Sequence, residues 1–210
     1  MVVGGPGAGK TMMLMQAMCG FVSKTRHGLY ISSDQTEEAM SAVFARANSL
    51  SELVPWSAME KRVQQKANAI DLVCTRHPGE AAGGIRQEKP ALVVVDSVAA
   101  FRDENFSESK AGHSIQVNNL MECCIDEARK VGAAIIFVFH TTKAGIPAGG
   151  KDADRRVDCR LDLAMLQHQD ISWQGQTRGY RQLRAVRNRF GPANVERVLQ
   201  ITKGGLLVEV

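Results

Sequence analysis

The 210-residue sequence predicts an α/β fold with a mostly parallel central sheet, flanking helices and β-hairpins at the C-terminal end. Strand-like and helix-like patterns alternate along the chain, which is typical of strand–helix–strand units. Two apolar runs, at 91–96 and 133–139, have no polar face and therefore predict strands buried on both sides of the sheet. We expect residues 1–210 to form one domain, because no repeat or linker divides them.

The first half of the chain predicts strands and helices in turn. Met1-Val2-Val3 is the apolar end of a strand, which a glycine-rich loop and a helix over 11–23 follow. Residues 28–32 predict the next strand, and residues 33–38 begin a helix that continues to about Asn48. The remaining predicted elements of this half are a polar helix at 57–68, a strand at 69–74 and a turn at 77–79.

The second half predicts one long helix, one long loop and several hairpin strands. Between residues 114 and 130 apolar side chains recur with helical spacing, at Val117, Leu120, Met121, Cys124, Ile125 and Ala128. Residues 142–156 combine glycines, a proline and alternating charges, which predicts a long loop. Loops of this length inside compact domains are more often functional or mobile than without a role. Short β-type runs occur at 159–166, 180–187, 195–201 and 205–210.

Composition indicates a globular protein without a membrane partner. Apolar residues make up 44% of the chain and charged residues 23%, and no run approaches the roughly 18 apolar residues of a membrane span. No signal-peptide pattern precedes the first loop, so we expect a cytoplasmic protein.

The five cysteines form no C-x-x-C pair, which predicts reduced thiols and no zinc site. Basic residues outnumber acidic ones between 155 and 203, as on a solvated surface or a polyanion-binding one.

Residues 4–11, Gly-Gly-Pro-Gly-Ala-Gly-Lys-Thr, match the P-loop pattern G-x-x-x-x-G-K-[ST] at every fixed position. In this pattern the loop backbone surrounds the phosphates of a nucleotide, with Lys10 supplying a positive charge and Thr11 a hydroxyl ligand for Mg²⁺. The preceding strand and the following helix support the match, because a helix N-terminus then faces the anion. The residues predicted to surround the phosphates are Gly5, Pro6, Gly7, Ala8, Gly9, Lys10 and Thr11.

Asp96 ends the first of the two long apolar strand patterns and is followed by Ser97. Four apolar residues and then an aspartate form the Walker B arrangement, in which a carboxylate at the end of a buried strand holds Mg²⁺ beside the P-loop. An aspartate at a strand end is often only a turn residue. With Lys10 and Thr11 present, we predict that Asp96 and Thr11 form the metal site.

Six sequence segments, in order along nearly all of the chain, resemble the bacterial RadA/Sms DNA-repair ATPases, which belong to the RecA/DnaB-like group of P-loop ATPases. The segments are 4–11, Tyr30-Ile31-Ser32, 93–97 (Val-Val-Val-Asp-Ser), Gly132-Ala133-Ala134, 140–143 (His-Thr-Thr-Lys) and 187–191 (Arg-Asn-Arg-Phe-Gly). The last segment is the most specific. The resemblance implies a RecA-like core with ATP as the nucleotide.

The resemblance implies roles for two residues near the phosphates. Asp34 takes the place of a glutamate that orients the attacking water, although its side chain is one methylene shorter. Asp34 also stands three residues before Glu37, where it would make a good helix N-cap. His140 matches the family's γ-phosphate sensor, which would couple the nucleotide to residues 142–156. A solvated histidine with no such role is the alternative.

The resemblance also implies a ring of subunits with nucleotide between neighbours. Arg187 and Arg189 match residues that reach across to the neighbour's nucleotide and neutralise charge on its γ-phosphate. Arg187 departs from the family, which usually has lysine there, so the charge is kept but its shape changes. The alternative is a pair of arginines on a solvated strand face. A homo-oligomer, by resemblance a hexameric ring, is therefore expected.

The predicted loop at 142–156 corresponds to the family's loop that contacts single-stranded DNA. Its basic residues are Lys143, Lys151, Arg155 and Arg156. Lysine and arginine bind phosphates without reading sequence, and the loop lacks aromatic residues for stacking on bases. DNA binding through the backbone, weakened by salt, is therefore expected. Residues 102–113 form a second candidate loop with mixed charges and no clear preference.

Three departures from the family accompany the resemblance. The family's N-terminal four-cysteine zinc module and its protease-like C-terminal domain have no counterpart in residues 1–210. The strand before the P-loop is also short, which predicts a truncated first strand. We therefore expect a single RecA-like ATPase domain over 1–210.

The leading functional prediction is a DNA-dependent ATPase of recombinational repair, which moves along single-stranded or branched DNA as a ring with ATP and Mg²⁺. One alternative keeps the fold: a minimal motor similar to replicative helicases. The other is a regulatory nucleotide-binding module without motor function, which Asp34 in place of glutamate and the short first strand favour.

Overall fold

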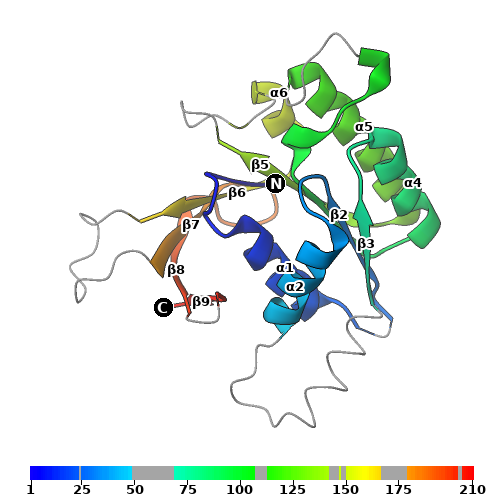
Figure 1. The fold of residues 1–210 in the computed structure, drawn as a ribbon. Helices are drawn as coiled ribbons and strands as arrows, with labels where there is room; N and C mark the ends of the chain where they lie inside the picture. The colour runs from blue at the N-terminus through cyan, green and yellow to red at the C-terminus, as the bar shows by residue number, and fades with distance from the viewer. Residues whose placement is uncertain are drawn as a thin grey trace, which may run out of the picture.

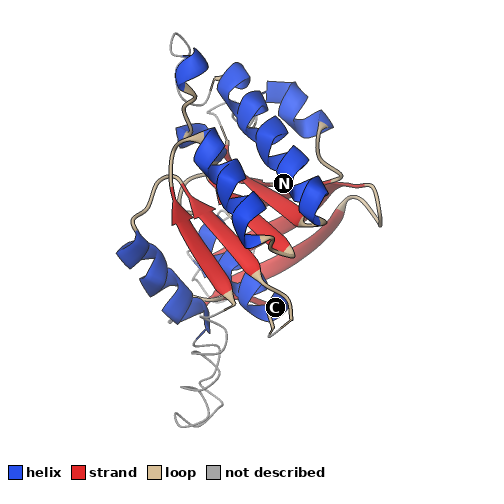
Figure 2. Ribbon diagram, turned by 90° about the vertical axis from the view of Figure 1, so that its right-hand side faces the viewer, coloured by secondary structure: helices blue, strands red, loops and turns tan. Residues whose placement is uncertain are grey.

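The computed structural model describes residues 1–23, 25–48, 69–106, 113–141, 147, 150–166, 179–202 and 205–210. In these residues one mixed sheet of nine strands has the order β3-β2-β4-β5-β1-β6-β7-β8-β9. Helices pack on both faces of this sheet (Figure 1, Figure 2). Of the helices in the described residues, none combines the length and the apolar character needed to cross a bilayer.

The sheet is parallel from β3 to β6 in this order and antiparallel from β6 to β9, as the sequence predicted. The parallel part contains β1 (Val2–Gly4), β2 (Gly28–Ser32), β3 (Ile70–Cys74), β4 (Leu92–Asp96), β5 (Ala134–His140) and β6 (Cys159–Met165). The antiparallel part adds β7 (Tyr180–Asn188), β8 (Val195–Ile201) and β9 (Leu207–Glu209).

Two layers of helices bury opposite faces of the sheet. The helices are α1 (Lys10–Phe21), α2 (Glu37–Asn48), α4 (Pro78–Glu88), α5 (Ser114–Val131) and α6 (Gly150–Arg155), with short 3₁₀ turns at Val98–Ala100 and Glu104–Phe106. In β2, Leu29 packs with α4 and α5, whereas the next residue, Tyr30, packs with α1 and α2. This alternation places each strand between two apolar layers, which explains the continuous apolar runs of the sequence.

Two local predictions were wrong. The predicted turn at 77–79 begins α4, whose three glycines weaken its helical signal but whose Ala81 and Ile85 are completely buried. The predicted loop at 142–156 contains α6, whose Ala153 is completely buried in the same core cluster. In both segments tertiary packing stabilises a helix that intrinsic propensity does not predict. The predicted helix at 57–68 lies outside the described residues.

The carboxyl ends of the parallel strands meet at one edge of the sheet. Ser32 pairs in register with Asp96 on the neighbouring strand, and Gly4 pairs with His140. In α/β sheets this edge is where ligands bind. The pairing therefore brings the end of the P-loop strand, the predicted Walker B aspartate and the predicted sensor histidine into one region.

Two exposed glycines offer a matched test of the helix boundaries. Gly132 follows α5 with a φ of 74°, whereas Gly20 lies inside α1, and a Cβ at either position meets no atom within 4 Å. We expect Gly132→Ala to lower the free energy of unfolding by about 1 kcal/mol, because alanine disfavours the left-handed conformation. Gly20→Ala is expected to raise it by about 0.5 kcal/mol. Urea unfolding of both variants measures the difference, and equal signs would contradict these boundaries.

Candidate nucleotide site

A cavity of about 450 Å³ lies at the carboxyl edge of the sheet. It is lined by the P-loop and the start of α1, by the ends of β2, β4 and β5, and by α2. Its lining residues are Pro6, Gly7, Gly9, Lys10, Thr11, Met12, Ser32, Asp34, Gln35, Val43, Arg46, Asp96 and His140. The structure thus brings together most residues predicted to bind nucleotide and metal, and all of them belong to segments that converge on this edge.

The P-loop conformation needs its glycines. Gly7 and Gly9 have φ values of 72° and 98°, in the region that favours glycine. A Cβ on Gly4 would lie 2.3 Å from the carbonyl oxygen of Leu163, because β6 passes directly beside it. Gly9 is the residue before α1, so the N-terminal N–H groups of this 12-residue helix face the cavity. Such a terminus favours a bound anion.

Lys10 is buried at the base of the loop. Its Nζ donates hydrogen bonds to the carbonyl oxygens of Gly4 at 2.8 Å and Gly5 at 2.9 Å, and lies 3.3 Å from His140 Nδ1. Burial lowers the pKa of Lys10, while the nearby Asp96 carboxylate opposes this shift. These contacts hold the ammonium group at the loop, where a phosphate oxygen would approach it.

Thr11 and Asp96 form the oxygen pair that the sequence predicted for Mg²⁺. Thr11 Oγ1 donates a hydrogen bond of 2.6 Å to Asp96 Oδ2. A hydroxyl and a carboxylate in contact are hard oxygen ligands of the kind that Mg²⁺ prefers. The donor set therefore fits the metal, with Thr11 and Asp96 as the residues that would hold it.

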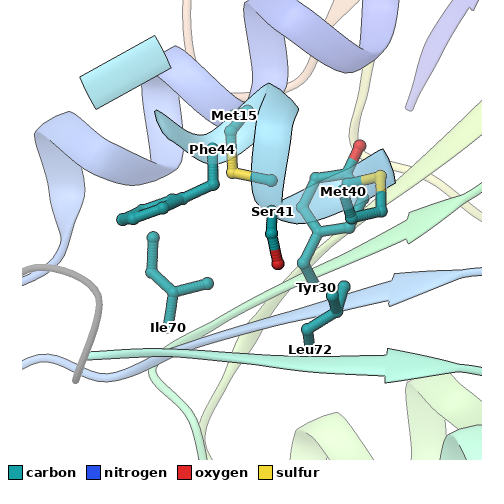
Figure 3. A pocket seen from close by; sticks show the side chains of 7 residues that line it. All are labelled: Met15, Tyr30, Met40, Ser41, Phe44, Ile70 and Leu72. Atoms are coloured by element: carbon teal, nitrogen blue, oxygen red, sulfur yellow. The ribbon is translucent and has the colours of Figure 1, made fainter. Parts of the chain in front are cut away.

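Tyr30 also holds Asp96, a role that was not predicted from the sequence. Its hydroxyl donates a hydrogen bond of 2.7 Å to Asp96 Oδ2. Burial, and secondarily Asp96 itself, raises the pKa of Tyr30 well above its ordinary value, so the hydroxyl remains the donor. The ring lines a small apolar cavity between α1, α2, β2 and β3 (Figure 3), together with Met15, Met40, Ser41, Phe44, Ile70 and Leu72. The tyrosine therefore fixes the carboxylate from within the packed layer.

Asp34 lies in the turn between β2 and α2 and lines the nucleotide cavity. Ser97 Oγ donates a hydrogen bond of 2.8 Å to its Oδ2. Its predicted second role as a helix N-cap was wrong, because α2 begins at Glu37 and the backbone N–H of Ala39 bonds instead to Thr36 Oγ1. Thr36 directly precedes the helix and so satisfies its first turn. The Asp34 carboxylate is left to face the cavity.

His140 ends β5 and is partly buried beside Lys10. Burial, and then the positive charge of Lys10, lowers the pKa of His140 below its usual value. A lowered pKa favours the neutral imidazole at neutral pH, in which one ring nitrogen can accept a hydrogen bond. Nδ1 can then accept one from the Lys10 ammonium. The histidine therefore contacts the P-loop lysine directly, in the position expected for a sensor of the phosphates.

Arg181 on β7 supports the loop from the other side, a role that its position in the sequence does not indicate. Its Nε donates a hydrogen bond of 2.9 Å to the carbonyl oxygen of Ala8, and its Nη2 lies 3.4 Å from that of Gly7. Burial lowers the pKa of this guanidinium. The signal in the sequence is weak, because Arg181 is one of several arginines on the same strand.

Arg187 and Arg189 do not reach this cavity in their own chain. β7 runs antiparallel to β6, so Arg181 pairs with Met165 near the P-loop, whereas Arg187 pairs with Arg160 at the opposite end. Six strand residues place Arg187 roughly 20 Å from Arg181. Arg187 Nη1 donates a hydrogen bond of 2.7 Å to the carbonyl oxygen of Asp154, and Arg189 forms a 2.6 Å ion pair with Asp158.

The residues predicted to contact DNA are only partly described. Lys143 and the side chain of Lys151 lie outside the described residues, although Lys151 belongs to α6. Arg155 and Arg156 are exposed and form long ion pairs with Asp152 at 3.8 Å and Glu122 at 3.7 Å. Of the second candidate segment, 102–113, the described part holds a 3₁₀ turn at Glu104–Phe106.

Comparisons with known proteins identify a matching family and several relatives of this chain. A family model described as an AAA domain matches residues 1–145. The DNA repair protein RadA of Haemophilus influenzae is 32% identical over 210 residues, which cover 98% of this chain and 39% of that protein. RadA of Brucella abortus is 30% identical over 207 residues, covering 98% of this chain and 40% of that protein. The chain thus spans about 40% of the length of these relatives.

Solved structures share the fold. A solved ATPase domain superposes with a TM-score of 0.74 at 14% identity, covering 100% of this chain and 83% of that one. The RadB recombinase superposes with a TM-score of 0.64 at 20% identity, covering 97% and 87%. These neighbours confirm the predicted RecA-like fold. The family model and the RadA relatives show that this chain belongs to the AAA domain family and confirm its resemblance to the RadA-type, RecA/DnaB-like ATPases.

Proposed function

We propose that this chain is the ATP-hydrolysing core of a DNA-dependent motor of recombinational repair, which acts as a ring on single-stranded or branched DNA. The observation that supports this most strongly is the meeting of Lys10, Thr11, Asp96 and His140 at one cavity behind a helix N-terminus. Relatives that are named DNA repair proteins, and that align over nearly the whole chain, support the assignment to repair.

Each residue of the nucleotide site has a separate role in this proposal. Lys10 and the loop N–H groups would bind the phosphates, and Thr11 and Asp96 would hold Mg²⁺, whose charge would stabilise negative charge on the phosphate oxygens. Tyr30 fixes the Asp96 carboxylate through its hydrogen bond. His140 lies in contact with Lys10. As a sensor, it would couple the presence or absence of the γ-phosphate to residues 142–156, which follow β5.

Asp34 orients the attacking water in this proposal. Its carboxylate faces the cavity, and the hydrogen bond from Ser97 Oγ fixes one of its oxygens. The other oxygen is then available to accept a proton or a hydrogen bond from water. Because aspartate is shorter than the glutamate found in the related family, we expect slow hydrolysis.

The position of the two arginines, at the end of the sheet away from the P-loop, supports ring assembly. About 20 Å of strand separates Arg187 from the P-loop end of its own β7, so it would serve the site of a neighbouring copy. Arg189 is exposed and next to the largely exposed Phe190, as expected at a surface that contacts another subunit. Charge supplied from a neighbour stabilises phosphoryl transfer.

We assign DNA binding to two exposed arginines, Arg155 at the end of α6 and Arg156 directly after it. Their ion pairs are long and exposed, so they are weak and can be exchanged for DNA phosphates. Contacts of this kind neutralise backbone charge and weaken as salt rises.

The first test is ATP turnover with and without single-stranded DNA, in the wild type and in Lys10→Ala. We expect DNA to raise turnover, added salt to reduce that stimulation, and the lysine variant to lose turnover because the phosphates lose their buried cation. ATP binding without turnover and without DNA affinity would instead favour a regulatory module. Unwinding of a tailed duplex would favour a motor of the replicative-helicase kind.

A second test changes only the proposed base. Asp34→Asn keeps an oxygen that accepts the Ser97 hydrogen bond but removes the negative charge, so turnover should fall about 100-fold while ATP affinity is retained. Asp34→Glu should turn over ATP at least as fast as the wild type. Equilibrium binding of a fluorescent ATP analogue provides the control, and an asparagine variant with wild-type turnover would exclude Asp34 as the base.

A further inference from the structure

The two arginines at the far end of the sheet are held very differently. Arg189 is exposed, and its partner Asp158 is exposed as well. Arg187 is only about one-third exposed and lies against the last turn of α6. Exposed ion pairs constrain a side chain little, whereas a partly buried contact with a helix end fixes its direction. The position of Arg187 therefore depends on α6, and that of Arg189 does not.

Asp154 is the α6 residue that holds Arg187. Its carbonyl oxygen accepts a 2.7 Å hydrogen bond from Arg187 Nη1, and its Oδ2 lies 3.8 Å from the same nitrogen. Its other carboxylate oxygen, Oδ1, lies 3.7 Å from Arg160 Nη1. This Oδ1 atom is buried and has no hydrogen-bond partner among the described residues. The carboxylate thus stands between two guanidinium groups and separates their like charges.

Arg160 is fixed independently of Asp154. Its Nε and Nη2 donate hydrogen bonds to the two oxygens of Asp162 at 2.8 and 2.9 Å, and its side chain is only 17% exposed. Bidentate pairs of this kind are strong and directional. If the charge of Asp154 is lost or displaced, the repulsion between the two guanidinium groups therefore moves Arg187 rather than Arg160.

The same short helix contributes to the predicted DNA surface. α6 spans Gly150–Arg155, so Asp154 is directly followed by Arg155 and Arg156. Arg155 is paired weakly with Asp152, and Arg156 with Glu122 on α5. A polyanion that displaced Asp152 and Glu122 from the two arginines would act on residues directly beside Asp154. One element thereby links the DNA contacts to the arginine at the sheet end.

We propose that Asp154 is a positioning residue that ties Arg187 to α6, so that a polyanion bound at Arg155 and Arg156 releases Arg187 from the body of its own subunit. This inference rests on the proposed function, in which Arg187 serves a neighbouring nucleotide site. It also explains why DNA would stimulate ATP turnover, because Arg187 would reach the neighbouring nucleotide site only after α6 moves.

The test is the rate at which phenylglyoxal modifies Arg187 and Arg189, followed by peptide mass spectrometry. Asp154→Asn should raise the rate at Arg187 several-fold and leave that at Arg189 unchanged. Asp158→Asn removes the same charge beside Arg189 and is the matched control, in which the Arg187 rate should stay at the wild-type value. Asp154→Glu restores the charge and should restore slow modification, with thermal melts verifying that each variant is folded.

A second experiment measures the same modification rates in the wild type after oligothymidylate is added. The oligonucleotide should raise Arg187 modification as Asp154→Asn does, and the variant should show less stimulation of ATP turnover by the oligonucleotide. Equal Arg187 rates in the wild type and Asp154→Asn would overturn the positioning role. Unchanged Arg187 modification despite DNA-stimulated turnover would overturn the link to DNA. Faster modification in the variant, with no stimulation by DNA in any protein, would retain the positioning role and reject the proposed function.

Discussion

The parallel pairing of β1, β4 and β5 in one sheet is the constraint on which the site depends. It places Gly4, Asp96 and His140 at the same edge, although more than 130 residues separate the first from the last. The contacts that define the site follow from this placement: Thr11 meets Asp96, and Lys10 meets His140. Close approach of β6 to the P-loop strand then leaves room for no side chain at Gly4.

Much of this arrangement could be predicted from the sequence because its signals are local. The P-loop pattern fixes a backbone shape, and Asp96 and His140 each end an apolar strand pattern, so parallel pairing alone brings them together. Tyr30 and Arg181 could not be predicted, because their roles arise from tertiary contacts. An aromatic residue in a strand predicts only a core position, and Arg181 contacts a loop more than 170 residues earlier in the chain.

Helices α4 and α6 were not predicted for the same reason: tertiary contacts stabilise them. α4 contains glycines and α6 is very short, so neither has a strong intrinsic signal, and each depends on alanines buried in the core. In the proposed function, the sheet has two functional ends. The P-loop end of the sheet is assembled within the subunit and could be predicted in outline, whereas the arginine end is organised by α6 and would act on another copy.

The most direct test of the central claim, that each nucleotide site is shared between copies, is to mix two variants that we expect to be inactive on their own. Lys10→Ala lacks a functional site but keeps its arginines, whereas Arg189→Ala keeps its P-loop but lacks one arginine. If arginines act on a neighbour, mixed assemblies contain some complete sites, and ATP turnover with single-stranded DNA should exceed the sum of the separate activities. No gain on mixing, in samples shown by light scattering to contain mixed assemblies, would contradict the account.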